Sequence, residues 1–222
     1  MAHPALVFDL DGTLVDTAPD LLGAMNAVLM QEGRETIDPT TLRHMVGFGA
    51  RSLIEQAMAA TGERILAERL PALVDSFVSH YRERIADESR PFPYVVETLS
   101  HFQRRGLAMG VLTNKPHELT LPLLDKLDLT KHFGAIHGAG HYAYVKPDPR
   151  VLHHLLDELG AKRDRAVMIG DSATDVATAR AAGIPVIVLS YGYTPIPAAE
   201  LGADAVIDRF SDLPSILNKL VS

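Results

Sequence analysis

The sequence has no cysteine among its 222 residues. Neither a disulfide framework nor a thiolate metal site can therefore hold the fold together, and such a chain fits a reducing compartment. A long hydrophobic run is also missing, because the longest apolar stretch, residues 184–189, is far too short to cross a bilayer. The start, Met1-Ala-His-Pro4, contains no apolar signal core. These absences predict a cytoplasmic protein without a membrane partner.

Basic residues are few as well. The chain has 21 lysines and arginines against 28 acidic residues, which gives a formal net charge of -7. It has no basic run and no alternation of basic and aromatic residues that would suit a nucleic-acid backbone, so we expect no nucleic-acid partner. With 47% hydrophobic residues, the chain can bury a sizeable core, and its length suggests one domain plus a subdomain.

Four short apolar runs end in acidic, hydroxyl or turn residues, which is typical of buried strands that stop at a polar edge. These runs are residues 5–9, 107–112, 165–169 and 185–189, and helical patterns occupy 95–105, 118–127, 149–159 and 173–182. Alternation of strands and helices predicts an α/β fold: a doubly wound, Rossmann-like core with a parallel sheet and right-handed crossovers.

The segment after the first strand has a different pattern. Residues 16–88 show helical periodicity at 21–30, 42–46, 52–60 and 67–85 and contain no credible strand. This predicts a small all-helical cap, residues 16–89, inserted into a core made of residues 1–15 and 90–222. Such a cap would lie over the C-terminal ends of the strands, where open α/β sheets bind ligands. The prolines of Arg90-Pro-Phe-Pro93 favour an extended linker at the return point.

Polar residues follow the predicted strands, and a parallel sheet would bring them to one edge. Four of them are carboxylates, and two unit charges ~4 Å apart repel by about 4 kcal/mol at an effective dielectric of 20, so we expect a cation among them. Oxygen ligands without cysteine or a histidine pair suit Mg²⁺. The neighbouring hydroxyl, amide and ammonium groups are donors suited to a phosphate dianion. The acids are Asp9, Asp11, Asp171 and Asp175, and the donors are Thr113, Asn114 and Lys146.

At these residues the sequence resembles the haloacid dehalogenase superfamily of phosphatases. Its four signatures occur in order, as Asp9-Leu-Asp11-Gly12-Thr13-Leu14, Thr113-Asn114-Lys115-Pro116, Lys146-Pro147 and Gly170-Asp171-Ser172-Ala173-Thr174-Asp175. The resemblance covers nearly the whole chain. Residues 8–21, 46–49 and 191–193 are similar to the phosphoglycolate phosphatase branch of that superfamily.

The resemblance implies a Mg²⁺-dependent hydrolase of small phosphorylated metabolites, with 2-phosphoglycolate favoured. Asp9 would be the nucleophile that forms an aspartyl-phosphate, and Asp11 the general acid and then the base. The metal would be held by Asp9, Asp171 and the backbone carbonyl of Asp11, with Asp175 in support. The phosphate would be bound by Thr113, Asn114 and Lys146, with the amides of Asp11 and Gly12 nearby.

Several alternatives stay open at this point. A β-phosphoglucomutase-like phosphotransferase shares the nucleophile, the acid and the cap, and a sugar phosphate, a nucleotide or pyrophosphate could replace 2-phosphoglycolate. A receiver-like signalling domain would also carry a phosphate on an aspartate. However, Asp11 would shorten the lifetime of that phosphate, and receivers lack a cap. The sequence leaves the choice between a monomer and a homodimer undecided.

Three further features have weaker assignments. Arg51 lies near Gly47-Phe-Gly49, a predicted substrate loop, and its planar fork suits a carboxylate, although most such arginines are solvated or paired. Asp175 could cap a helix and Thr113 could simply end a strand. The histidines show no spacing that indicates a second metal cluster, so surface or core packing is expected for His137, His141, His153 and His154.

Overall fold

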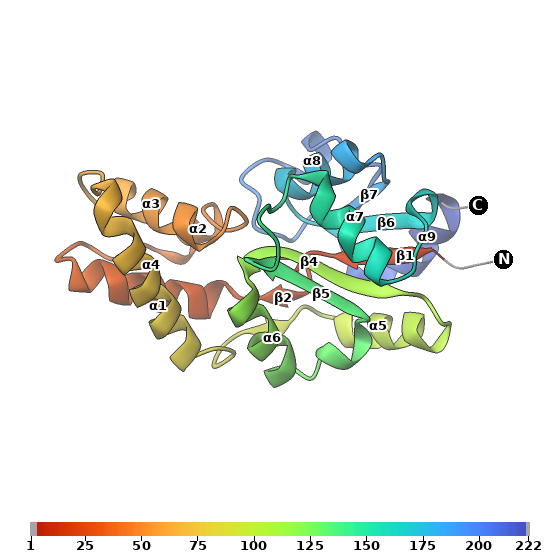
Figure 1. Ribbon diagram of the computed structural model, residues 1–222, viewed down its shortest axis with the longest axis horizontal. Coiled ribbons are helices and arrows are strands. Elements are labelled where there is room, and N and C mark those ends of the chain that lie inside the picture. The colour runs from red at the N-terminus through yellow and green to blue at the C-terminus, as the bar shows by residue number, and fades with distance from the viewer. Residues whose placement is uncertain (1–3, 221–222) are drawn as a thin grey trace.

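The computed structural model describes residues 4–220, and a six-stranded sheet lies at its centre (Figure 1). The strand order is β5-β4-β1-β6-β7-β8, and every neighbouring pair is parallel. The predicted doubly wound α/β core is therefore confirmed. The strands are β1 (Ala5–Phe8), β4 (Met109–Pro116), β5 (Ala135–Ala139), β6 (Ala166–Gly170), β7 (Val186–Leu189) and β8 (Ala205–Ile207).

The central strand β1 shows why the strands of this sheet can be predicted from the sequence. All four of its residues are buried. Leu6 and Phe8 pack into one hydrophobic cluster, and Ala5 and Val7 pack into the cluster on the opposite face. A strand covered on both faces needs apolar side chains at consecutive positions rather than at alternate ones, so it reads as a continuous apolar run.

Helices cover both faces of the sheet (Figure 1). The cluster that contains Phe8 includes residues of α5 (Val95–Arg104), α6 (His117–Lys126) and α9 (Leu213–Leu220). The cluster that contains Val7 includes residues of α7 (Pro149–Glu158) and α8 (Ala173–Ala182). Four of these five helices coincide with the helical patterns of the sequence, and they return the chain to the same edge of the sheet before each strand.

Residues 17–89 form a separate group of helices beyond the C-terminal ends of the strands (Figure 1). Its helices are α1 (Ala18–Gln31), α2 (Pro39–Arg43), α3 (Ala50–Ala60) and α4 (Leu70–Glu83), with a 3₁₀ turn at Ala67–Arg69. We call these helices, with the loops that join them, the cap. The arrangement matches the expectation that a helical insertion lies above the strand ends, where it can cover a ligand.

The sequence missed four strands. Strand β5 contains His137 and Gly138, and β8 has only three residues and is partly buried, so neither gives a long apolar run. The other two, β2 (Val15–Asp16) and β3 (Arg90–Pro91), form a small antiparallel pair where the chain enters and leaves the cap. The predicted extended linker at Arg90 is thus partly a strand. Among residues 4–220, no helix combines the length and the apolar character needed to cross a membrane.

Candidate active site

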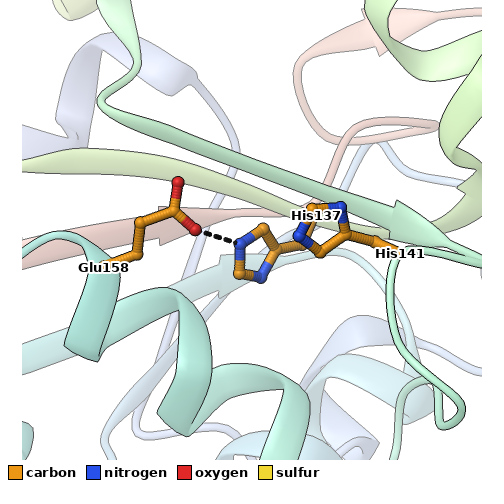
Figure 2. Close-up of side chains that lie close together, drawn as sticks. All are labelled: His137, His141 and Glu158. Carbon is orange, nitrogen blue, oxygen red and sulfur yellow. Dashed lines mark hydrogen bonds and ion pairs between the residues drawn. The ribbon is translucent and has the colours of Figure 1, made fainter.

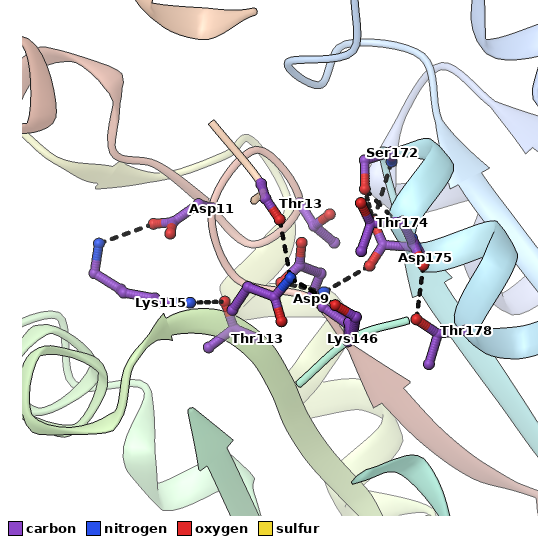
Figure 3. A network of polar contacts seen from close by, with 12 residues as sticks. Asp9, Asp11, Thr13, Thr113, Lys115, Lys146, Ser172, Thr174, Asp175 and Thr178 are labelled. Atoms are coloured by element: carbon purple, nitrogen blue, oxygen red, sulfur yellow. Dashed lines mark hydrogen bonds and ion pairs between the residues drawn. The ribbon is translucent and has the colours of Figure 1, made fainter. Parts of the chain in front are cut away.

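Three buried carboxylates meet at the C-terminal edge of the sheet. Figure 3 shows two of them, Asp9 and Asp175, close to Lys146. Asp9 directly follows β1, Asp171 directly follows β6, and Asp175 lies in the first turn of α8. One oxygen atom from each lies within 4.8 Å of the others. Their relative exposures are 3%, 2% and 0%, so these charges have almost no contact with water. We call this group the carboxylate cluster.

The electrostatics of the carboxylate cluster favour a bound cation. Burial raises the pKa of Asp9 to about 7, although the positive charge of Lys146 opposes the change. Burial and the charges of Asp175 and Asp9 also raise the pKa of Asp171 well above its usual value. Lys146 Nζ lies 2.9 Å from Asp9 Oδ1 and 2.6 Å from Asp175 Oδ1, so one ammonium group pairs with two of the three clustered carboxylates. An all-oxygen donor set with excess negative charge fits a hard divalent cation.

Hydrogen bonds fix the orientation of the carboxylates. Thr13 Oγ1 donates to Asp171 Oδ1 over 2.7 Å, and the amide of Tyr193 donates to Asp171 Oδ2 over 2.8 Å. Asp175 Oδ2 accepts from the hydroxyl and the amide of Ser172, and Ser172 in turn accepts from the Asp175 amide. This capping box begins α8, so Asp175 caps the helix and also belongs to the carboxylate cluster.

Glycines allow the backbone to approach the carboxylates closely. A Cβ atom at Gly192 would lie 2.1 Å from Cβ of Asp171, and one at Gly170 would lie 2.3 Å from Cγ of Asp175. Real side chains do not tolerate such distances, so each position requires glycine. Sequence reasoning did not assign Gly192 to the site, although it stands in the Tyr-Gly-Tyr segment that the resemblance had singled out.

Asp11 lies beside the carboxylate cluster but is held by other partners. Its Oδ1 atom accepts from Thr17 Oγ1 over 2.7 Å and from Lys115 Nζ over 3.1 Å. Figure 3 shows its carboxylate directed toward Lys115, on the side of Asp9 away from Asp175. Sequence reasoning gave Lys115 no role. A signal was present, because a lysine at the end of a buried strand needs a charged partner, and Lys115 is 4% exposed.

The predicted phosphate-binding residues lie at the same edge. Asn114 Nδ2 donates to the carbonyls of Gly47 and Lys146, both over 3.1 Å, and thereby connects the core to the cap and to the segment before α7. Thr113 Oγ1 accepts from the amide of Lys115 over 3.2 Å, which leaves its hydrogen free to donate. The cavity above Asp9 is lined by core residues Asp11, Thr113, Asn114 and Lys115 and by cap residues Leu21, Val46, Gly47, Gly49, Ala50, Leu53 and Phe77.

Two residues predicted from the sequence are placed differently. The amide of Gly12 donates to the carbonyl of Val15 over 3.0 Å, so it is already used inside the turn rather than free for phosphate. Arg51 pairs with Glu55 over 3.5 Å on the surface of α3, and its side chain is 68% exposed. Arg51 does not line the cavity above Asp9, so the structure gives no support to its predicted contact with the substrate.

Comparison with known proteins identifies several that are similar to this chain. Residues 6–189 match the model of the haloacid dehalogenase-like hydrolase family. A phosphoglycolate phosphatase of Caulobacter vibrioides is 48% identical over 209 residues, which cover 94% of this chain and 88% of that protein. A phosphoglycolate phosphatase of Agrobacterium fabrum is 40% identical over 220 residues, which cover 99% of this chain and 94% of that protein. The crystal structure of a predicted phosphoglycolate phosphatase from Haemophilus somnus superposes on this chain with a TM-score of 0.91 at 29% identity. The superposition covers 96% of this chain and 97% of that protein.

Proposed function

Because the chain belongs to the haloacid dehalogenase-like hydrolase family and is a phosphatase, we propose that it hydrolyses 2-phosphoglycolate to glycolate and phosphate, using Mg²⁺ and an aspartyl-phosphate intermediate. The observation that carries this proposal is the carboxylate cluster, in which Asp9 and Asp175 pair with Lys146 and Asp171 lies within 4.8 Å of both acids. The name of the similar proteins, phosphoglycolate phosphatase, supports the choice of substrate.

Mg²⁺ is assigned to Asp9, Asp171 and the backbone carbonyl of Asp11, with Asp175 in support. All of these donors are oxygen atoms, which Mg²⁺ prefers to nitrogen or sulfur. The bound ion would offset the negative charge of the carboxylate cluster and attract the phosphate dianion toward Asp9. The raised pKa values of Asp9 and Asp171 support this assignment, because a nearby divalent charge favours the ionised form that burial alone disfavours.

The proposed reaction has two steps, with Asp9 as the nucleophile. In the first, a carboxylate oxygen of Asp9 bonds to phosphorus, the bond from phosphorus to the glycolate oxygen breaks, and Asp11 gives its proton to that oxygen. In the second, a water oxygen bonds to phosphorus, Asp11 accepts the proton of that water, and the bond between phosphorus and Asp9 breaks. Thr113 and Lys146 donate hydrogen bonds to the phosphoryl oxygens, which carry the transition-state charge.

Asp11 needs to turn for this role. Its carboxylate is bonded to Thr17 and Lys115 rather than directed at Asp9. Lys115 is itself covered by the cap, because its ammonium group lies 4.2 Å from the ring centre of Tyr81. A rotation of the Asp11 side chain away from Lys115 would bring the carboxylate toward a leaving group on the substrate. Catalytic hydrogen bonds are often absent until substrate is bound, so the observed position is compatible with the proposed acid.

The cap supports a short, anionic substrate. Its side chains Leu21, Leu53 and Phe77 line the cavity above Asp9 and offer no hydrogen bonds to a sugar or a base. The same cavity is bordered by Gly49 and Ala50, where α3 begins without a side-chain cap. Amides at a helix N-terminus favour an anion, and the carboxylate of 2-phosphoglycolate is such an anion.

The test is a comparison of kcat/KM over a panel of phosphate esters. We expect 2-phosphoglycolate to exceed a sugar phosphate, a nucleotide and pyrophosphate by at least about tenfold, or ~1.4 kcal/mol of transition-state stabilisation. Chelation should abolish the activity and Mg²⁺ should restore it. A clear preference for another ester would refute the substrate, and activity that survives exhaustive chelation would refute the metal.

The nucleophile is tested separately by acid quenching and mass spectrometry. Phosphate should appear on the peptide that contains Asp9 in the unaltered protein and be absent from Asp9→Asn, which should also lack turnover. Normal turnover by Asp9→Asn would exclude the proposed chemistry. A sugar added to the reaction separates hydrolysis from transfer, since a phosphotransferase would give a new sugar phosphate rather than free phosphate.

A further inference from the structure

A second group of possible metal ligands lies on the face of the sheet that is covered by α7. His137 belongs to β5, His141 follows that strand, and Glu158 is the last residue of α7. One donor atom from each lies within 4.8 Å of the others. Figure 2 shows the ring of His137 with Glu158 on one side and His141 on the other. The spacing of these histidines predicts only surface or core packing, but the structure brings two of them together with an acid.

The contacts within this group are close. His137 Nε2 lies 2.7 Å from Glu158 Oε2. The rings of His137 and His141 are stacked, with their centres 4.5 Å apart, and the ring centre of His117 lies 4.8 Å from that of His141. Three imidazoles at such distances would repel one another if all were protonated. Histidine binds a metal ion as a neutral ring, a form in which this repulsion is absent.

His137 is the residue that an ordinary ion pair does not explain. It is 2% exposed, and its Nδ1 atom has no hydrogen-bond partner among residues 4–220. A buried polar atom without a partner costs free energy, and the pair with Glu158 does not offset this cost at Nδ1. Burial also lowers the pKa of His137, which keeps the ring neutral near pH 7. A neutral imidazole has one nitrogen with a free electron pair, and this is the atom that binds a metal ion.

We propose that His137, His141 and Glu158 form a second metal site, for a divalent transition metal ion of the Zn²⁺ class. Two imidazoles and one carboxylate are a ligand set that Zn²⁺ accepts, with bonds of about 2.0–2.2 Å and a water molecule in the remaining position. The carboxylate cluster offers only oxygen atoms and suits Mg²⁺, so ligand type separates the two sites. The side chains of His141 and Glu158 are exposed and can adjust their positions around the ion.

The position of this site suggests what the ion would do. It joins β5, the turn after it and the end of α7, and the chain between β5 and α7 carries Lys146. An ion held by residues on both sides of this connection would restrict its movement. The inference does not depend on the proposed substrate or on the chemistry of Asp9, because none of the three ligands lines the cavity above Asp9.

The test is Zn²⁺ binding by the full chain without an affinity tag, measured by calorimetry in the presence of excess Mg²⁺. We expect one Zn²⁺ per chain, and a loss of affinity of at least about 100-fold in His141→Ala and in Glu158→Ala, since even indirect partners of a metal are worth 10–100-fold. Both side chains are exposed, so these variants should fold normally, as equal melting temperatures in a chelator would show.

Matched controls separate this site from others. Asp157→Ala removes the neighbouring acid of α7, and His44→Ala removes an exposed histidine of the cap; both should bind Zn²⁺ as the unaltered protein does. Asp171→Asn disables the carboxylate cluster and should also keep Zn²⁺ bound. Co²⁺ offers a second readout, because nitrogen ligands in a tetrahedral site give visible absorption that His141→Ala should remove. Equal affinity in all variants, or a loss confined to Asp171→Asn, would overturn the proposal.

Discussion

Stability in the absence of metal should fall as the pH rises, because Asp9 is buried in a cluster of like charges. Its pKa is raised from 3.8 to about 7. A raised pKa means that the folded state binds the proton more tightly than the unfolded state, so ionisation favours unfolding. The contribution is therefore fully present below pH 3.8, decreases as the pH rises, and is lost above about pH 7. The interval corresponds to about 4 kcal/mol at 1.36 kcal/mol for each pH unit.

The measurement is urea unfolding in a chelator from about pH 4 to about pH 8, on the unaltered protein and on Asp9→Asn. Other titrating groups act on both proteins, so the difference between the two free energies of unfolding isolates the carboxylate cluster. As the pH rises, the free energy of unfolding of the unaltered protein should fall relative to that of Asp9→Asn by up to about 4 kcal/mol. Mg²⁺ should restore more stability at pH 8 than at pH 5, because only the ionised carboxylates bind it.

A difference that does not change with pH would refute this reasoning. It would mean that Asp9 is ionised at low pH despite its burial, and that Lys146 alone compensates the cluster. Stabilisation by Mg²⁺ that is equal at both pH values would contradict the link between ionisation and metal binding. A shift of the opposite sign would indicate that the folded protein prefers the charged form of the cluster.

Four further predictions follow from the site. Asp11→Asn should slow both formation and breakdown of the phosphoenzyme by ~10²–10⁴-fold in rapid-quench kinetics, and full activity would reassign the acid. Lys146→Met should destabilise the metal-free protein by about 3–5 kcal/mol in urea, since buried carboxylates lose their partner, and Mg²⁺ should recover part of this. Gly192→Ala should weaken Mg²⁺ binding and lower the melting temperature, because its methyl group would stand 2.1 Å from Cβ of Asp171. Arg51→Ala should leave kcat/KM for 2-phosphoglycolate within about twofold, as expected for an exposed pair, and a large loss would return Arg51 to the site.

The sequence by itself determined the layers of the fold. A strand buried on both faces has to be apolar at every position, so β1, β4, β6 and β7 could be recognised from short runs. The helices between them could be recognised from their periodicity and their terminal glycines. Parallel strands end at the same edge, so Asp9, Thr113 and Asp171 could be placed together before any coordinates were known.

Tertiary structure decided what depends on partners far away in the chain. Strand β8 pairs with one neighbour and is partly exposed, and its three apolar residues are too few to be recognised as a strand. Lys115 donates a hydrogen bond to Asp11, which is 104 positions away in the sequence. The amide of Tyr193 donates to Asp171 because the loops that carry these two residues lie next to each other. Arg51 stands next to a predicted substrate loop in sequence, yet the direction of its side chain on α3 places it in solvent.

The histidine site shows the same limit most clearly. His137 and Glu158 are 21 positions apart, on a strand and on the helix that packs against it. Their distance depends on the register between β5 and α7 and on which side of each element the two side chains occupy. The register between the two elements and the orientation of the side chains cannot be predicted from composition and spacing, because both arise from packing in the folded chain.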